Sequence, residues 1–123
     1  MNEEILQHVQ QAYGVENWSA GYFEVNARGN ITVRPAAGDP RYADLKEILD
    51  YLMARHKVQA PVLLRFPQIL SAQLRKLSAA YQAAIAEYKY GGQHFPLYPM
   101  KVNPRREVVE EFLRESARCN ALV

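Results

Sequence analysis

The sequence has little of what marks secreted, membrane-spanning or disulfide-bonded proteins. It contains one cysteine, Cys119, so no disulfide can form within the chain, which fits a reducing compartment. No run of 18 apolar residues is present, so no transmembrane helix is predicted. The first residues, MNEE, carry acid where a signal peptide needs positive charge. From these absences we expect a cytoplasmic protein without a membrane partner.

A strong excess of one charge is also lacking. Lysine and arginine total 15 against 13 acidic residues, which gives a net charge of +2. That balance gives no electrostatic case for binding nucleic acid or an anionic membrane. Hydrophobic residues make up 49% and charged residues 23% of the chain, a mixture typical of a globular protein. The 123 residues suffice for one ordinary domain or for part of a larger one.

Residues 1–38 predict a short helix followed by a β-hairpin. Apolar residues recur at helical spacing over 3–13, and Gly14 ends the pattern. Over 21–34 apolar and polar residues alternate, with Phe23 and Val33 expected on the same face of the sheet. The Arg28-Gly29-Asn30 run supplies the turn between the two strands. Pro35 closes the hairpin.

From residue 39 onward the pattern alternates between helix and strand. Asp39 is a suitable N-cap and Pro40 suits the first position of a helix that runs to residues 55–57. Apolar residues 61–66 predict a strand buried on both faces, and Pro67 starts a long helix that ends before Gly91. Residues 97–103 predict a second buried strand, and Pro104 begins a third helix. Such alternation predicts a parallel α/β sheet covered by helices.

One lysine lies inside the second predicted strand. Lys101 stands between Met100 and Val102, near the carboxyl end of that strand, where α/β barrels gather their reactive groups. A desolvated lysine has a lowered pKa and can form a Schiff base with an aldehyde. The same pattern also fits a lysine whose alkyl stem simply reaches solvent. Histidines 8, 56 and 94 are scattered, so with one cysteine they have no zinc-ligand spacing.

Several stretches in series resemble the biosynthetic arginine decarboxylases. Residues 98–103 (YPMKVN) are similar to the strand that carries the cofactor lysine in that family. Residues 13–18 (YGVENW), 29–35 (GNITVRP) and 61–70 (PVLLRFPQIL) resemble other stretches of the family in the same order. The resemblance covers about residues 13–115.

This resemblance implies a fold, a cofactor and an activity. The fold would be a (β/α)8 TIM-type barrel with a separate β domain, so that 1–38 would belong to the β domain and 39–123 would begin the barrel. Lys101 would be the catalytic residue and would hold pyridoxal 5′-phosphate. L-Arginine would be converted to agmatine and CO2, which would feed polyamine biosynthesis. The family resemblance also implies Mg²⁺, for which no ligands are identifiable, and homo-oligomers.

The resemblance covers the amino-terminal part of the family only. A closed (β/α)8 barrel takes about 250 residues, so we expect 39–123 to form an incomplete barrel and the chain alone to be inactive. Two alternatives remain open. The chain could belong to another barrel-type decarboxylase, acting on ornithine or diaminopimelate, although Tyr98-Pro99 argues against this. It could instead be a non-catalytic domain that binds a partner.

Overall fold

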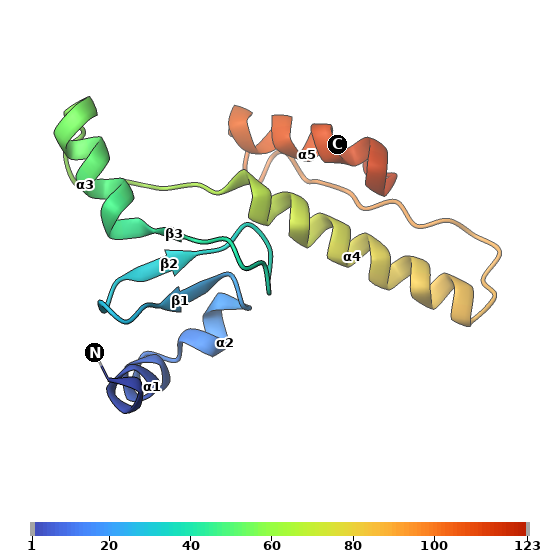
Figure 1. Ribbon diagram of the computed structural model, residues 1–123. Helices are drawn as coiled ribbons and strands as arrows, with labels where there is room; N and C mark the ends of the chain where they lie inside the picture. Colours follow the sequence, from blue (N-terminus) through green and yellow to red (C-terminus); the bar gives the residue numbers. More distant parts are fainter. Residues whose placement is uncertain (1, 123) are drawn as a thin grey trace. The chain divides into compact units, whose positions relative to one another are not determined.

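The computed structural model describes residues 2–122. The chain divides into two compact units, Met1–Arg65 and Phe66–Val123. The first contains α1 (Glu3–Ala12), α2 (Val15–Ser19), β1 (Phe23–Val25), β2 (Ile31–Val33), β3 (Ala43–Asp44) and α3 (Leu45–His56). The second contains α4 (Pro67–Glu87) and α5 (Arg106–Cys119), as labelled in Figure 1. The fold is therefore a mixture of helices and a small sheet.

The predicted hairpin is confirmed. Strands β1 and β2 are antiparallel, with Phe23 opposite Val33. The turn between them depends on Gly29, whose φ of +82° is a conformation that costs glycine little. The Gly29 N–H donates to the Asn26 carbonyl at 2.8 Å and closes the turn. Helices α1 and α2 pack against β1, and α3 packs against β2 and β3.

The predicted start of α3 is wrong. Asp44, and not Asp39, is the N-cap, and its Oδ1 accepts hydrogen bonds from the Lys46 and Glu47 N–H groups at 2.9 and 3.3 Å. The Asp39 carboxylate is instead held by Arg41, through that residue's N–H and guanidinium. Residues 43 and 44 also pair with β2 as a third antiparallel strand, which the sequence pattern did not predict. This pairing delays the helix by five residues.

Asp44 is the buried centre of a polar cluster. The residue is 4% exposed, and Oδ2 accepts hydrogen bonds from the side chains of Asn26 (2.8 Å), Arg28 (2.8 Å) and Asn30 (2.9 Å). Hydrogen bonds to a charged carboxylate favour its ionised form. The bond from Asn30 is the main reason that the pKa of Asp44 is lowered from 3.8 to about 2. The cluster thus joins the hairpin turn to the start of α3.

Asp44→Asn is expected to destabilise the first unit. An amide at this position would point an N–H₂ group at donors that now meet a carboxylate, which leaves the part-buried donors of Asn26 and Asn30 without that acceptor. We expect a lower thermal midpoint, measured by circular dichroism at pH 7. Asp50→Asn is the matched control, because Asp50 is an exposed residue of the same helix whose carboxylate pairs with Lys46. An equal fall in both variants would contradict the assigned role of Asp44.

The same cluster predicts an acid dependence of stability. Since folding lowers the pKa of Asp44, its contribution is complete above pH 3.8 and is lost as the pH falls toward about 2. The Asp44→Asn protein should therefore lose less stability than the wild type between pH 4 and about pH 2. The pKa of Asp39 is also lowered to about 2, chiefly by its hydrogen bond from Arg41. That contribution is common to both proteins and does not affect the difference.

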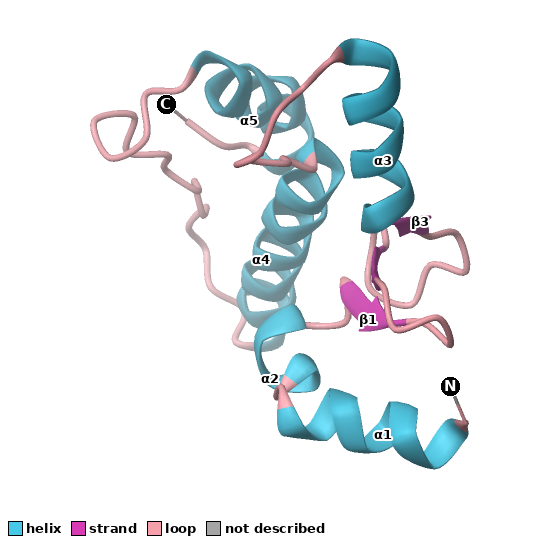
Figure 2. Cartoon of the chain, turned by 90° about the vertical axis from the view of Figure 1, so that its left-hand side faces the viewer, coloured by secondary structure: helices cyan, strands magenta, loops and turns pink. Residues whose placement is uncertain are grey.

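The second unit is built on the contact between α4 and α5, which lie side by side in Figures 1 and 2. Leu74, Phe112 and Cys119 are buried there, with Tyr98 and Ala121 packed against them. Polar contacts supplement this small core. The Ser71 hydroxyl donates to Glu111 at 2.6 Å, and the Ser78 hydroxyl donates to the Cys119 carbonyl at 3.4 Å. The core is therefore concentrated on the first half of α4.

Helix α4 begins at Pro67 as predicted, but its apolar stripe is only partly covered. Leu74 is buried, whereas Leu77, Tyr81 and Tyr88 are exposed. The periodicity correctly indicates a helix, because it reflects the spacing of apolar side chains. The periodicity does not indicate which of these apolar side chains are buried against other elements.

The strand predicted at 61–66 is wrong, and so is its predicted burial. This segment is extended without being a strand, and Leu63 is 71% exposed. A parallel strand forms when neighbouring strands provide its backbone hydrogen bonds. An apolar composition alone does not provide those neighbours.

The strand predicted at 97–103 is shortened to one bridge. Leu97 pairs in parallel with Leu122. The Tyr98 N–H donates to the Leu122 carbonyl at 2.9 Å, and the Leu122 N–H donates to the Pro96 carbonyl at 2.8 Å. Helix α5 lies between the paired segments in the chain. The assignment of 1–38 to a β domain and of 39–123 to a barrel stays a prediction.

Among residues 2–122, no helix is both long and apolar enough to cross a bilayer.

Candidate functional site

Lys101 lies in the loop between the Leu97–Leu122 bridge and α5. Met100, Lys101 and Val102 form a turn, in which the Val102 N–H donates to the Pro99 carbonyl at 2.9 Å. The Lys101 side chain is exposed. The prediction that it is part of a buried strand is therefore wrong. The reason is that the parallel pairing ends at Tyr98, three residues before the lysine.

The exposure of Lys101 removes the desolvation argument made from the sequence. Activation by desolvation requires an amine that is shielded from water, whereas Lys101 is exposed. No hydrogen bond or ion pair joins its ammonium to another residue in the described part of the chain. The amine is thus sterically accessible, without a neighbour that would make it unusually nucleophilic.

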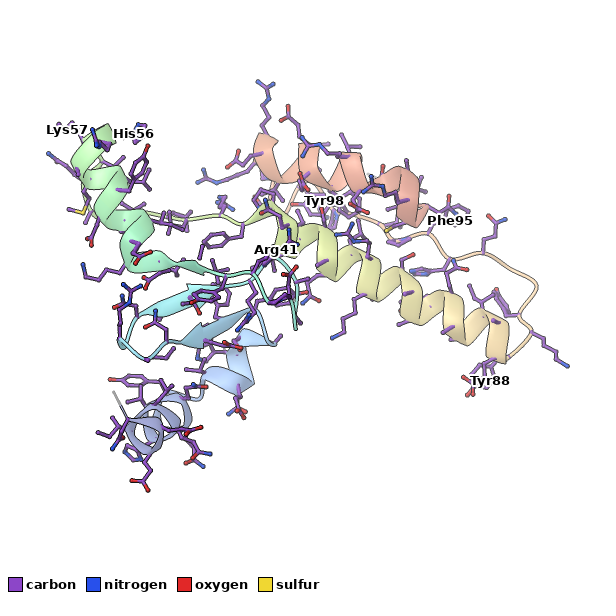
Figure 3. All side chains as sticks on the ribbon, in the orientation of Figure 1. Arg41, His56, Lys57, Tyr88, Phe95 and Tyr98 are labelled. Atoms are coloured by element: carbon purple, nitrogen blue, oxygen red, sulfur yellow. The ribbon has the colours of Figure 1, made fainter. Side chains whose placement is uncertain are left out.

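The loop around Lys101 is held by Tyr98. The Tyr98 hydroxyl donates to the Asn103 carbonyl at 2.9 Å, and its ring centroid lies 4.9 Å from that of Phe112. Figure 3 labels Tyr98 beside α5. The Asn103 side chain in turn accepts a hydrogen bond from the Arg105 N–H at 3.4 Å, just before the helix begins. Both ends of the loop are therefore fixed by contacts within the second unit.

The described residues do not by themselves form a site that fits pyridoxal phosphate. Such a site must enclose the phosphate and the ring as well as supply the lysine, and Lys101 is an isolated, exposed amine. A hollow of about 840 Å³ lies at α1 and α2 in the other unit. It is lined mainly by acidic and amide side chains, which do not suit a phosphate: Glu3, Glu4, Gln7, Gln10, Gln11, Glu16 and Asn17.

The histidines lie in separate places. His56 is in a tilted contact with Tyr51, with ring centroids 5.4 Å apart. His94 stacks on Tyr81 at 3.7 Å, and its Nε2 is buried without a hydrogen-bond partner. In residues 2–122, no three His, Cys, Asp or Glu side chains gather as metal ligands. Within these residues the structure therefore identifies no ligands for the expected Mg²⁺.

The structural role of Tyr98 was not predicted from the sequence. The Tyr98-Pro99 pair contributed to the resemblance, but no local pattern indicates that the hydroxyl reaches the Asn103 carbonyl. The only signal in the sequence was a large aromatic residue three positions before Lys101, the residue predicted to be reactive. The partnership with Phe112 depends on how α5 folds back, which periodicity does not specify.

We predict that Lys101 reacts with acetic anhydride at a rate within about threefold of the exposed Lys76 on α4, because both are ordinary solvated amines. Mass spectrometry of the peptides after a short pulse gives both rates in one sample. Lys76 is the internal control. Labelling of Lys101 slower by about a hundredfold would indicate a buried amine and would contradict the structure.

Comparison with curated proteins finds relatives that share one name. The chain is 44% identical over 100 residues to the biosynthetic arginine decarboxylase of Deinococcus radiodurans, covering 81% of this chain and 15% of the relative. The corresponding protein of Synechococcus sp. (strain RCC307) is 40% identical over 108 residues, covering 88% and 17%. That of Bacteroides thetaiotaomicron is 37% identical over 115 residues, covering 94% and 18%.

No family model matches the chain. The chain spans less than a fifth of the length of these curated relatives, while the alignments include most of the chain itself. The resemblance predicted from the sequence motifs is therefore confirmed: along most of its length, this chain is similar to one segment of the biosynthetic arginine decarboxylases.

Proposed function

We propose that this chain forms part of an arginine decarboxylase, which converts L-arginine to agmatine and CO2 in polyamine biosynthesis. The observation that carries the proposal is the sequence identity of 37 to 44% to biosynthetic arginine decarboxylases, spread over most of the chain. Identity of this extent is far more specific than any single motif. The exposed amine of Lys101 by itself would not distinguish a decarboxylase from any other protein.

The proposal includes the start of a (β/α)8 barrel within residues 39–123. The parallel pairing of Leu97 with Leu122, with α5 between them in the chain, supports it. Parallel neighbouring strands connected by a helix are the repeating unit of such barrels. The β1–β2 hairpin, which lies within residues 1–38, would correspondingly belong to a β domain. Homo-oligomeric assembly and Mg²⁺ follow from the resemblance alone and stay predictions.

We assign Lys101 the role of the lysine that holds pyridoxal phosphate in the complete enzyme. Its position supports this, because it directly follows the segment that pairs in parallel and precedes the helix. Loops of this kind, at the carboxyl ends of strands, carry the reactive groups of (β/α)8 barrels. The groups that bind the phosphate and the ring would have to come from outside residues 2–122, so the chain by itself is expected to be inactive.

A partner-binding role is the second candidate. Leu97 and Val102 are each more than 70% exposed in the second unit, and the same is true of Leu63 in the first. Large apolar side chains with this exposure are typical of surfaces that another protein segment covers. A partner-binding domain without catalytic function would need these residues and would not need Lys101.

Replacing a segment of a relative tests the proposed function. The 100-residue stretch of the Deinococcus radiodurans enzyme that matches this chain would be exchanged for this chain's own residues. We expect the hybrid to release CO2 from carboxyl-labelled arginine and to form agmatine. The isolated 123-residue chain should form none. Lys101→Ala should lower the activity of the hybrid by about a thousandfold or more, because the nucleophile is lost.

Lys76→Ala in the same hybrid is the matched control, since Lys76 is an exposed lysine of α4. It should retain activity within about twofold of the parent hybrid. If the hybrid is active and Lys101→Ala leaves that activity unchanged, Lys101 is not the cofactor lysine. If the hybrid is folded and soluble but forms no agmatine, the non-catalytic reading is favoured.

A further inference from the structure

Tyr98 makes three separate contacts at the start of the loop that carries Lys101. Its N–H donates to the Leu122 carbonyl at 2.9 Å, its ring lies against Phe112, and its hydroxyl donates to the Asn103 carbonyl at 2.9 Å. The first two contacts fix the residue to the core of the second unit. The third extends from that core to the far end of the loop.

The hydroxyl bond closes a loop of six residues, 98–103. Inside the loop, the Val102 N–H donates to the Pro99 carbonyl and forms a tight turn. Lys101 lies in this turn, with its side chain exposed and its ammonium unpaired within residues 2–122. Because the Lys101 side chain makes no hydrogen bond or ion pair within residues 2–122, the direction in which it projects depends on the backbone of the loop. That backbone is fixed by Tyr98.

We propose that Tyr98 is a positioning residue whose hydroxyl, by closing loop 98–103, sets the place from which Lys101 presents its amine. The proposal rests on the function proposed for Lys101. Tyr98 contacts neither substrate nor cofactor in this account, and it acts only through the loop. Its ring and its hydroxyl have distinct roles. The ring packs against Phe112 of α5, while the hydroxyl donates a hydrogen bond to the Asn103 carbonyl.

Tyr98→Phe separates these two roles, because it keeps the ring and removes only the hydroxyl. Trypsin cleaves after Lys101, and it does so only when the loop opens into an extended conformation. In the full 123-residue chain we expect Tyr98→Phe to accelerate cleavage after Lys101 by about three- to tenfold, the effect of losing one hydrogen bond on the population of the open loop. Mass spectrometry at short times gives the rate at each site.

Two references distinguish loop opening from general unfolding. Cleavage after Lys89, which follows α4, should stay within about twofold of the wild-type rate, as should the thermal midpoint within about 2 °C. Tyr88→Phe is the matched control, because the Tyr88 ring is 78% exposed and it lies at the end of α4. An unchanged rate after Lys101 in Tyr98→Phe, or equal acceleration after Lys101 and Lys89, would overturn the loop-closing role.

The hybrid decarboxylase then tests whether loop closure matters for the reaction. Tyr98→Phe should lower kcat by about three- to tenfold and leave KM for arginine within about twofold, because the substrate does not contact Tyr98. An unchanged kcat would overturn the positioning role even if the loop opens. The function of Lys101 is judged separately by Lys101→Ala, so failure of one proposal does not imply failure of the other.

Discussion

Two backbone hydrogen bonds connect residues that are far apart in the sequence and define how the second unit is arranged. They run from the Tyr98 N–H to the Leu122 carbonyl and from the Leu122 N–H to the Pro96 carbonyl. Because they bring the segments before and after α5 together, α5 is held with Phe112 facing Tyr98 and Leu74. Without this pairing, the segment 96–98 would lose its backbone hydrogen bonds to Leu122.

The same pairing determines where Lys101 lies and how exposed it is. Since the parallel pairing ends at Tyr98, the lysine lies in the following loop and is exposed to water. An exposed amine is accessible but not activated, so activation would have to come from groups that surround it in a complete enzyme. The chain thus provides the loop that holds Lys101, the residue proposed to carry the cofactor. The rest of the proposed site is not found in residues 2–122.

The elements that could be predicted from sequence are those set by local interactions. The hairpin follows from alternation and from Gly29, and α4 starts where Pro67 predicts. Helix α5 starts at Arg106, two residues after the predicted Pro104, which is within the usual uncertainty of a helix end. In each case the signal lies within a few residues of the feature.

The elements that were predicted wrongly depend on distant partners. Asp39 and Asp44 are both good caps, and the choice between them is made by the pairing of β3 with β2 and by the cluster at the hairpin turn. Residues 61–66 have the composition of a buried strand but not its neighbours, so Leu63 is exposed. The candidate site shows the same limit. The motif around Lys101 identifies a relationship to arginine decarboxylases, whereas its exposure and the hydroxyl contact of Tyr98 depend on where Phe112, Asn103 and Leu122 fold.

Amide hydrogen exchange measured by NMR tests the pairing on which this account depends. The Tyr98 and Leu122 amides should exchange about a hundredfold or more slowly than the Lys101 amide, because both are donors in the parallel pairing. Nuclear Overhauser contacts between residues 96–98 and Leu122 should accompany this protection. If both amides exchange as fast as that of Lys101 and the contacts are absent, the parallel bridge around α5 does not form, and the position assigned to Lys101 is wrong.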